Sequence, residues 1–414
     1  MTAGVGIAVA AQLVLARIIA TNHNQAAPID ITKLALTIVG GVGGAVALVV
    51  AYRRQRDLEQ NRFVERFGSA AAQLGSGDVA VRIAGVYAMA GVADESAGLN
   101  RQQCIDVLCG YLRLPYDPEH GGSGRTKLVT KTVAKRDPVS GEKDVEEEEH
   151  TEYRQNDREV RQTIVRVIAD HLRTTAEYSW STSDFDFRTA HLEDIDFGGA
   201  RFSGDARFEG AAFSGNANFE KAVFSGDASF ESAVFSGDAW FGDTTFSGDA
   251  WFRDTTFSGD AWFGTATFSG TARFELATFS STARFESATF SSTARFGGAT
   301  FSHRAGFKGA IFSGVVGFGA ATFSQRAGFE GVVFSGTAEF GDATFSGTAE
   351  FGDATFSSTA RFDRVHFGTE VISFAEPRRW GPPAPRFDWD HDLTQMPDNV
   401  QPQDWPPTVA AGSE

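Results

Sequence analysis

Cysteine is scarce in this sequence, its histidines are not clustered, and it has no excess of positive charge. Its 414 residues include only two cysteines, Cys104 and Cys109, which excludes a disulfide framework and argues for a reducing compartment. The eight histidines are scattered, and no Cys/His spacing suits zinc. The formal net charge of -16 argues against direct binding to nucleic acid, because neutralising phosphates needs clustered Lys and Arg. No phosphate-binding loop follows a strand, so we expect no catalytic, cofactor or metal site.

One stretch near the start lacks charge altogether. Residues 34–52 are 19 uncharged positions, and a helix of that length roughly matches a hydrocarbon core of about 30 Å. Four arginines follow at once: Arg53, Arg54, Arg56 and Arg62. Their positive charge predicts that the rest of the chain lies on the cytoplasmic side of a cell membrane. With residues 3–20 as a second candidate, we predict a membrane anchor over residues 1–56, with one or two transmembrane helices at about 3–20 and 34–52.

The second apolar segment also contains two glycines spaced for helix association. Gly40 and Gly44 form a GxxxG pair, which would let two helices approach closely in the lipid bilayer and form a homo-oligomer. Small residues are common in membrane helices in any case, so this pair is compatible with a monomer as well.

After the anchor, the spacing of apolar residues becomes helical. We predict a helical region over residues 57–114, completed by a helix within residues 153–178. The predicted inward face of the helix after Asp78 is formed by Val79, Ile83, Val86, Tyr87 and Ala90. Cys104 and Cys109 are five positions apart on one helix, so we interpret them as core residues rather than a redox pair. Residues 115–152 end in an acidic run. We predict that they form a disordered polar insertion or, alternatively, a binding tail.

Phenylalanine, with 38 residues against 6 Tyr and 7 Trp, follows a repeat in the second half of the chain. One series recurs at every eleventh position from Phe202 to Phe367, and a second series with the same period runs from Phe208 to Phe362. The two series have 16 and 15 members, so they include 31 of the 38 phenylalanines. A small residue stands two positions before nearly every one of them. The repeat defines a domain over residues 183–374.

An eleven-position period is also typical of a right-handed coiled coil, so the two structures have to be separated. The apolar pairs here are at i and i+2, which share a face only in an extended strand. Ser-Gly pairs such as Ser203-Gly204 would each weaken a helix by about 1 kcal/mol. No proline lies between Pro138 and Pro377, as continuous ladders require. The pattern therefore favours short strands with Ala and Phe pointing inward and Ser-Gly-Asp at the corners.

At this point the sequence resembles the pentapeptide-repeat family, whose A-x-[LF]-x-x units build a right-handed, four-sided β-helix. Ala190–Leu192 and Ala200–Phe202 match that unit, after which the spacing alternates between six and five positions. The resemblance implies a mainly β fold, a right-handed quadrilateral β-helix of about eight to nine coils, with about 22 residues per coil. The stretches 73–76, 81–88 and 107–111 are similar to the helical segment that membrane-tethered bacterial members have before their repeats.

The residues between the inward Ala and Phe are predicted to face solvent. The candidate partner surface consists of three tryptophans and three arginines at these positions: Trp240, Trp251, Trp262, Arg273, Arg284 and Arg295. A coil of the expected length stacks Trp240 on Trp262 and places Trp251 on another face. The alternative is that these ladders only stabilise neighbouring coils. Corner carboxylates such as Asp205 and Asp227 also lie above one another in successive coils. We interpret them as solvated turns or, alternatively, as a cation site.

Proline returns only at the end, where residues 375–414 form a Pro-rich tail with 8 of the 12 prolines. We predict that this tail covers or leaves the open end of the solenoid. Residues 388–392 are the densest ligand-like cluster of the chain, and a metal site there is the less favoured interpretation.

The sequence favours a non-enzymatic scaffold, a cytoplasmic β-helix held at a membrane and presenting its ladders to an unknown protein partner. The alternative comes from the resemblance, because some pentapeptide-repeat proteins mimic duplex DNA and bind type II topoisomerase. Residues 183–374 contain 24 acidic residues against 13 Lys and Arg, which suits such mimicry in sign. The outward arginines and the predicted membrane anchor count against it.

Overall fold

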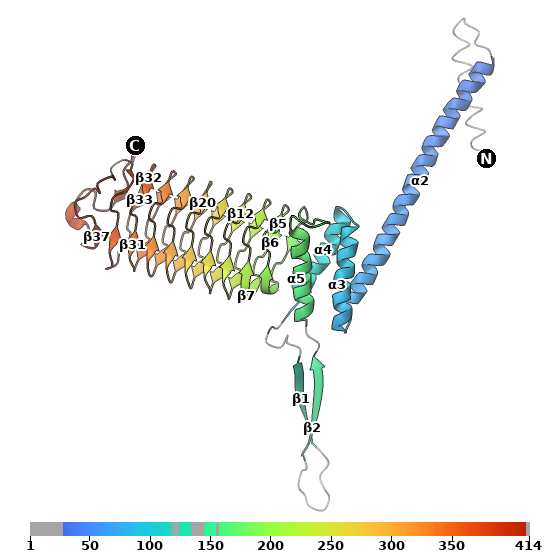
Figure 1. Ribbon diagram of the computed structural model, residues 1–414, viewed down its shortest axis with the longest axis horizontal. Coiled ribbons are helices and arrows are strands. Elements are labelled where there is room, and N and C mark those ends of the chain that lie inside the picture. The colour runs from blue at the N-terminus through green and yellow to red at the C-terminus, as the bar shows by residue number, and fades with distance from the viewer. Residues whose placement is uncertain (1–27, 117, 119–123, 134–144, 155–156, 411–414) are drawn as a thin grey trace, which may run out of the picture. The chain divides into compact units, whose positions relative to one another are not determined.

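The computed structural model describes residues 28–116, 118, 124–133, 145–154 and 157–410 (Figure 1). The chain divides into two compact units after Gly68. The first unit contains most of helix α2 (Pro28–Leu74). The second contains the end of α2, three further helices, a hairpin and the repeat domain.

Helix α2 exposes large apolar side chains in the first unit. Leu36 and Leu48 are 64% and 73% exposed, so these side chains are not packed against other described residues of the unit. The helical conformation predicted for residues 34–52 is confirmed. Across the described residues, however, no helix is both long and apolar enough to cross a membrane. The candidate segment 3–20 lies outside the described residues.

The helical region of the second unit consists of α3 (Val79–Asp94), α4 (Leu99–Leu112) and α5 (Arg158–Leu172). Helix α3 begins after Asp78, whose carboxylate accepts a hydrogen bond from the Ala80 amide at 2.8 Å. Of the predicted stripe on α3, Val86 and Ala90 are buried as expected, and the rest of the buried face is formed by Gly85, Met89, Val92 and Ala93. Tyr87 is 52% exposed, because it lies about 100° around the helix from the buried Val86.

The insertion between α4 and α5 differs from the predicted disordered segment. Strand β1 (Gly124–Val133) pairs with β2 (Val145–Arg154) in an antiparallel hairpin. The register places Lys131 opposite Glu147. The basic half and the acidic half of the insertion are therefore two strands of one ribbon.

The repeat domain is a parallel β-solenoid of about nine turns, as the period of the Phe series predicts (Figure 1). Most coils have four short strands, and the strands pair with the equivalent strands of the next coil, as Trp240 does with Trp262. We number the four faces in the order in which the chain passes through them, so faces 1 and 3 lie on opposite sides of the coil, as do faces 2 and 4.

The strands of face 1 are β3 (Phe185–Asp186), β6 (Ala206–Arg207), β9 (Ala228–Ser229), β13 (Ala250–Trp251), β17 (Ala272–Arg273), β21 (Ala294–Arg295), β25 (Val316–Gly317), β29 (Ala338–Glu339), β33 (Ala360–Phe362) and β36 (Arg386–Phe387). Face 2 contains β10 (Val234–Phe235), β14 (Thr256–Phe257), β18 (Thr278–Phe279), β22 (Thr300–Phe301), β26 (Thr322–Phe323) and β30 (Thr344–Phe345). Two longer strands in the first coils, β4 (His191–Asp196) and β7 (Ala212–Asn218), turn the corner from face 2 to face 3.

Face 3 contains β11 (Ala239–Trp240), β15 (Ala261–Trp262), β19 (Ala283–Arg284), β23 (Ala305–Gly306), β27 (Ala327–Gly328), β31 (Ala349–Glu350), β34 (Ile372–Ser373) and β37 (Val400–Gln401). Face 4 contains β5 (Arg201–Phe202), β8 (Val223–Phe224), β12 (Thr245–Phe246), β16 (Thr267–Phe268), β20 (Thr289–Phe290), β24 (Ile311–Phe312), β28 (Val333–Phe334), β32 (Thr355–Phe356) and β35 (Arg379–Trp380).

Phenylalanine rings fill the interior of the solenoid. Rings one coil apart stack nearly parallel, with centroids 4.8 Å apart for Phe241 and Phe263. In the second Phe series, rings half a coil apart come from opposite faces and meet edge to face, with centroids 5.5 Å apart for Phe230 and Phe241. Both arrangements suit the ring quadrupole, so each ring is held by its neighbours along and across the coil.

The alternation of shorter and longer spacings corresponds to two kinds of corner. In the shorter kind, Glu220 and Lys221 separate Phe219 from Ala222, and Lys221 has a left-handed φ of 57°. The longer kind, between Phe224 and Ala228, is a Ser-Gly-Asp corner as predicted. Gly226 in that corner lies so close to the previous coil that a Cβ there would be 2.6 Å from the Gly204 carbonyl oxygen.

Both ends of the solenoid are covered. Helices α4 and α5 lie against the first strands, β3 and β4 (Figure 1). The Pro-rich tail covers the other end with an aromatic cluster, in which Trp389 is 3% exposed and the Trp405 ring stands perpendicular to Phe387 with centroids 4.9 Å apart. The tail includes the short 3-10 helix η1 (Leu393–Gln395). Of the two predicted roles for the tail, the structure shows the covering one.

Candidate functional site

The six residues predicted as a partner surface form two ladders on opposite faces. Trp240, Trp262 and Arg284 follow one another on face 3, each paired with the next in register. Trp251, Arg273 and Arg295 do the same on face 1. The predicted separation of Trp251 from the other two tryptophans is confirmed, so the six residues do not form a single patch.

Within each ladder, an arginine lies over a tryptophan ring. The Arg284 guanidinium carbon is 3.8 Å from the centroid of Trp262, and that of Arg273 is 4.7 Å from the centroid of Trp251. Such contacts contribute about 0.5–1 kcal/mol each at exposed sites. Asp260 lies 3.9 Å from Arg284 and Asp249 lies 3.9 Å from Arg273. These contacts join neighbouring coils and support a structural role for part of each ladder.

Exposure differs along the ladders. Trp262 is 38% exposed, whereas Trp240 and Trp251 are half-buried by their neighbours. Arg295 is exposed, and its closest carboxylate oxygen, on Glu275, is 3.7 Å away. The exposed Trp262 ring and the exposed Arg295 guanidinium are the ladder groups most open to a partner.

The corner aspartates have a structural role that the sequence did not reveal. Asp227 Oδ1 accepts a hydrogen bond from the Asp249 amide at 3.0 Å, and Asp249 Oδ1 accepts one from the Thr271 amide at 2.9 Å. The same contact recurs at the next corner, from the Asp260 amide to Asp238. Each carboxylate thus satisfies a backbone amide of the following coil. Among the described residues, no three His, Cys, Asp or Glu side chains are grouped in a way that would hold a metal ion.

A charged cluster and a hollow lie together on face 3, which sequence reasoning missed. Arg326 donates to Glu330 at 2.8 Å and to Glu350 at 2.6 Å. The hydrogen bond to Glu330, together with burial, raises the pKa of Glu350. The adjoining hollow has a volume of about 300 Å³ and is lined by Glu330, Thr348, Glu350, Gly352, Val371 and Ser373. The only sequence signal was Arg326 itself, at a position where Asp or Thr stands in several other coils.

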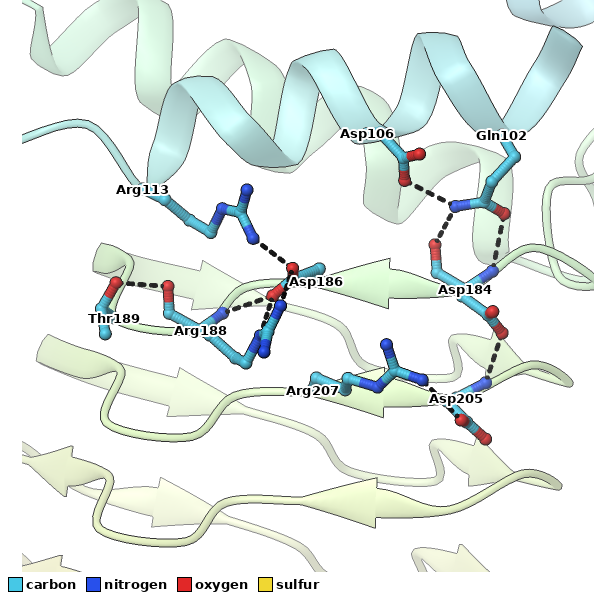
Figure 2. A network of polar contacts seen from close by, with 9 residues as sticks. All are labelled: Gln102, Asp106, Arg113, Asp184, Asp186, Arg188, Thr189, Asp205 and Arg207. Atoms are coloured by element: carbon cyan, nitrogen blue, oxygen red, sulfur yellow. Dashed lines mark hydrogen bonds and ion pairs between the residues drawn. The ribbon is translucent and has the colours of Figure 1, made fainter. Parts of the chain in front are cut away.

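At the other end of the domain, α4 takes the place of a preceding coil (Figure 2). The Gln102 amide nitrogen donates to the Asp184 carbonyl at 2.8 Å, while the Asp184 amide donates to the Gln102 side-chain oxygen at 3.0 Å. This side chain therefore pairs with the first coil as a neighbouring strand would. Asp184 in turn accepts from the Asp205 amide at 2.9 Å, which begins the series of corner carboxylates.

The second part of this junction is an ion-pair cluster around Asp186 (Figure 2). Arg188 donates to both carboxylate oxygens of Asp186 at 2.8 Å, and Arg113 at the end of α4 also pairs with this carboxylate. The hydrogen bonds from Arg188, with the charge of Arg113, lower the pKa of Asp186 to about 2. The cluster joins the helical region to face 1 of the solenoid.

The other candidate groups have ordinary structural roles. Cys104 and Cys109 are buried free thiols, and burial raises the pKa of Cys104 to about 11 and that of Cys109 to about 12. Thiols held protonated in this way are poor nucleophiles. In the tail, Asp388 and Asp390 accept hydrogen bonds from the Arg364 and Phe387 amides, at 2.7 and 2.9 Å.

Comparison with known proteins agrees with this geometry. The model of a family described as pentapeptide repeats matches in nine copies, over residues 187–234, 219–267, 263–311, 307–355 and 329–372. No curated protein and no solved structure matches the chain. With its coils of four short strands and its inward Phe ladders, the repeat domain of this chain belongs to the pentapeptide-repeat family.

Proposed function

We propose that this protein is a non-catalytic interaction scaffold whose solenoid binds a protein partner through face 3. The observation that carries the proposal is the contrast between the two sides of each strand. Inward positions repeat Ala and Phe with few exceptions, whereas the outward centre of face 3 changes from Trp to Arg, Gly, Glu and Ser. Variable outward side chains on a repeated backbone with constant inward side chains are typical of repeat proteins that bind other proteins.

Face 3 has the features of a recognition surface. The exposed ring of Trp262 lies near one end, and the hollow of about 300 Å³ beside Glu350 lies near the other. Between them, Gly306 and Gly328 are buried beneath the Glu286 and Glu330 carboxylates, so this part of face 3 presents acidic groups. Aromatic side chains and arginines that fill pockets are the groups that contribute most to binding in protein interfaces, so the Trp262 ring and a hollow able to receive a partner side chain suit this role.

We further propose that the N-terminal part attaches the scaffold to a membrane, with the solenoid on the cytoplasmic side. The support is the uncharged stretch 34–52, the arginines that follow it, and the exposed apolar side chains of α2 such as Leu48. No described atom lies within 4 Å of a Cβ built on Gly40 or Gly44, which leaves room for a second helix there.

Fractionation of the native cell tests the membrane part. We expect the protein in the membrane pellet after alkaline carbonate washing, and in the supernatant when Val46 and Val49 are both replaced by Arg. The same replacement of Val81 and Tyr87, exposed apolar residues of α3, is the matched control and leaves the protein in the pellet. A soluble wild-type protein at native expression would overturn this part.

Proximity labelling in the native cell tests the partner part. The variant Trp240→Thr with Trp262→Thr removes the aromatic groups of face 3, and Thr occupies outward positions on faces 2 and 4. We expect it to lose the labelled partner, whereas Trp251→Thr on face 1 keeps it. Equal labelling by both variants would reject face 3 as the binding surface.

The acidity of the repeat domain leaves the DNA-mimic alternative as a second candidate. Its net charge supports it, but outward arginines on two faces, including Arg284 and Arg295, interrupt any continuous acidic surface. Purified protein that leaves the supercoiling activity of a type II topoisomerase unchanged at micromolar concentration would remove this candidate.

A further inference from the structure

Face 1 has opposite charges on either side of a position without a side chain. Gly317 pairs in register with Arg295 on one side and with Glu339 on the other. Arg295 and Glu339 are exposed, and no described atom lies within 4 Å of a Cβ built on Gly317. At about 4.8 Å per coil, the two charged positions are about 10 Å apart with Gly317 midway.

The surroundings of Gly317 are small or apolar. Val315 is 44% exposed at a position where the neighbouring coils have Thr293 and Thr337. On the other side of the strand, Gly319 follows Phe318, with Gly297 and Gly341 one coil away in each direction. Face 1 therefore has only small or apolar groups around Gly317, and its outward charges, Arg295 and Glu339, lie one coil away on either side.

We propose that face 1 is an interface between two copies of this chain, face to face with antiparallel solenoid axes and a two-fold axis at Gly317. A two-fold interface requires that residue i meets residue j and that j meets i. Here Arg295 meets the partner subunit's Glu339, and Glu339 meets the partner subunit's Arg295. Val315 and Gly317 meet their own copies on the axis. This interface is separate from face 3 and does not depend on membrane attachment.

The charges also select the antiparallel arrangement. With parallel axes in the same register, Arg295 would meet its own copy and like charges would repel. In the antiparallel arrangement the next positions outward are Arg273 and Arg361. Arg361 donates to Asp363 at 2.8 Å, and Arg273 lies over Trp251 with Asp249 3.9 Å away, so both cations have negative or aromatic neighbours. Arg295 also has a carboxylate neighbour, Glu275 at 3.7 Å, but its side chain is more exposed than that of Arg273, at 54% against 34%.

Face 3 offers a similar order of charges but is less suited to pairing with itself. Its acidic group, Glu350, is already bound by Arg326 at 2.6 Å. The Glu286 carboxylate lies over Gly306, so close that a Cβ on that glycine would be 2.3 Å from it. The glycine stretch of face 3 is thus covered by side chains from its own domain, whereas Gly317 on face 1 is open.

The expected dimer is weak. Five coils of short strands give a patch about 24 Å long and only a few residues wide. The area that such a patch buries is at the low end of those known for specific interfaces. The dimer should therefore form in proportion to protein concentration and be sensitive to salt. Covalent trapping is better suited to such a contact than a sedimentation measurement at low concentration.

Disulfide trapping in the full-length protein tests the interface. The variants Gly317→Cys and Val315→Cys place a thiol on the proposed axis, and both positions accept a side chain without a left-handed φ. The matched control is Gly264→Cys beside face 3, where the nearest atom to a Cβ is 3.7 Å away. Under mild oxidation we expect a covalent dimer for both axis variants, at about tenfold the level of the control. Cys104 and Cys109 are buried and give the wild-type background.

The orientation is tested by pairs of cysteines off the axis. Thr293→Cys and Thr337→Cys lie one coil on either side of Val315. In the antiparallel arrangement neither variant crosslinks with itself, but a mixture of the two forms a dimer. Self-crosslinking of each variant alone would contradict the proposed orientation.

Charge reversal completes the test. In the Gly317→Cys background, Arg295→Glu or Glu339→Arg alone should reduce crosslinking about tenfold, because each creates two like-charge contacts. The two reversals together restore it, because every contact is again between opposite charges. The proposal is overturned if neither axis variant crosslinks above the Gly264→Cys control, or if the double reversal remains as low as the single ones.

Discussion

The inward positions of the solenoid differ in what they require of a side chain. Phe241 is fully buried among other rings, and its position requires a large aromatic group. Thr244 is also fully buried, at a position where most coils have Ala. Its hydroxyl donates to the Phe219 carbonyl at 2.7 Å, so the polar group is satisfied. The position before the strand therefore requires small volume rather than an apolar group.

This difference predicts unequal costs for two substitutions in the same coil. Phe241→Ala should lower the free energy of unfolding by about 3–5 kcal/mol, since it leaves a cavity among stacked rings. Thr244→Ala should change it by less than about 1 kcal/mol, because the Phe219 carbonyl keeps its bond from the Ala222 amide at 3.0 Å. Urea denaturation of the two variants measures both values. Equal losses would contradict the assigned packing.

The Asp186 cluster predicts an acid-dependent part of stability. The folded-state pKa of Asp186, about 2, lies below its ordinary value of 3.8, so the ionised carboxylate stabilises the folded state. This contribution is fully present above about pH 4 and is lost as the pH falls through about 2. Asp186→Asn should remove it, and Arg188→Ala, which removes the bidentate donor but leaves Arg113 in place, should reduce it. The measurement is the free energy of unfolding between about pH 2 and pH 5, and a wild-type slope in Asp186→Asn would refute the assignment.

At the residue scale, the sequence predicts the inward side chains better than the corners. The two series that begin at Phe202 and Phe208 place four inward side chains in every coil of 22 residues. The left-handed backbone of Lys221 and Leu276 has no signature, because neither residue type prefers that conformation. The contacts of Asp227 were also invisible in the sequence, because they join residues of successive coils and exist only once the coil has closed.

Helix α4 is the element that starts the solenoid. Gln102 pairs with both backbone groups of Asp184, so we expect Gln102→Ala to lower the free energy of unfolding by about 1–3 kcal/mol. The neighbouring Gln103 is exposed, and Gln103→Ala should be nearly neutral. Gln102→Glu keeps the acceptor but places a carboxylate oxygen against the Asp184 carbonyl and the Asp106 carboxylate, so it should destabilise at least as much as Gln102→Ala. Denaturation curves of the three variants test this, and a neutral Gln102→Ala would show that the first coil does not need the cap.

Among the elements, the long periodic ones were predictable and the local ones less so. The helices with buried Ile105 and Ile164 follow from their apolar spacing. The hairpin of β1 and β2 was predicted as disordered, because its alternating Thr, Lys and Glu positions show no apolar face. The tail was ambiguous in the sequence, and only its aromatic contacts, such as those of Trp389 and Trp405, show that it covers the end of the solenoid.

At the scale of the whole molecule, the solenoid divides its surface by chemistry. Faces 2 and 4 expose mainly Thr, Val and Ile at their outward centres, as Thr278 and Thr267 illustrate. Faces 1 and 3 carry the tryptophans and the outward charges. The Phe series predicts the four-sided backbone that separates the faces. It does not predict what each face binds, because the outward residues follow no period. We assign face 3 to a partner and face 1 to a second copy.

The most direct test of the account is site-specific photo-crosslinking around a single coil in the native cell. A photoreactive amino acid is placed in turn at Trp262 on face 3, Thr267 on face 4, Arg273 on face 1 and Thr278 on face 2. We predict adducts with another protein at Trp262, adducts of the chain with itself at Arg273, and none at the two threonines. The same adducts at all four positions, or none at Trp262, would contradict the central claim that this protein is a scaffold with a dedicated partner face.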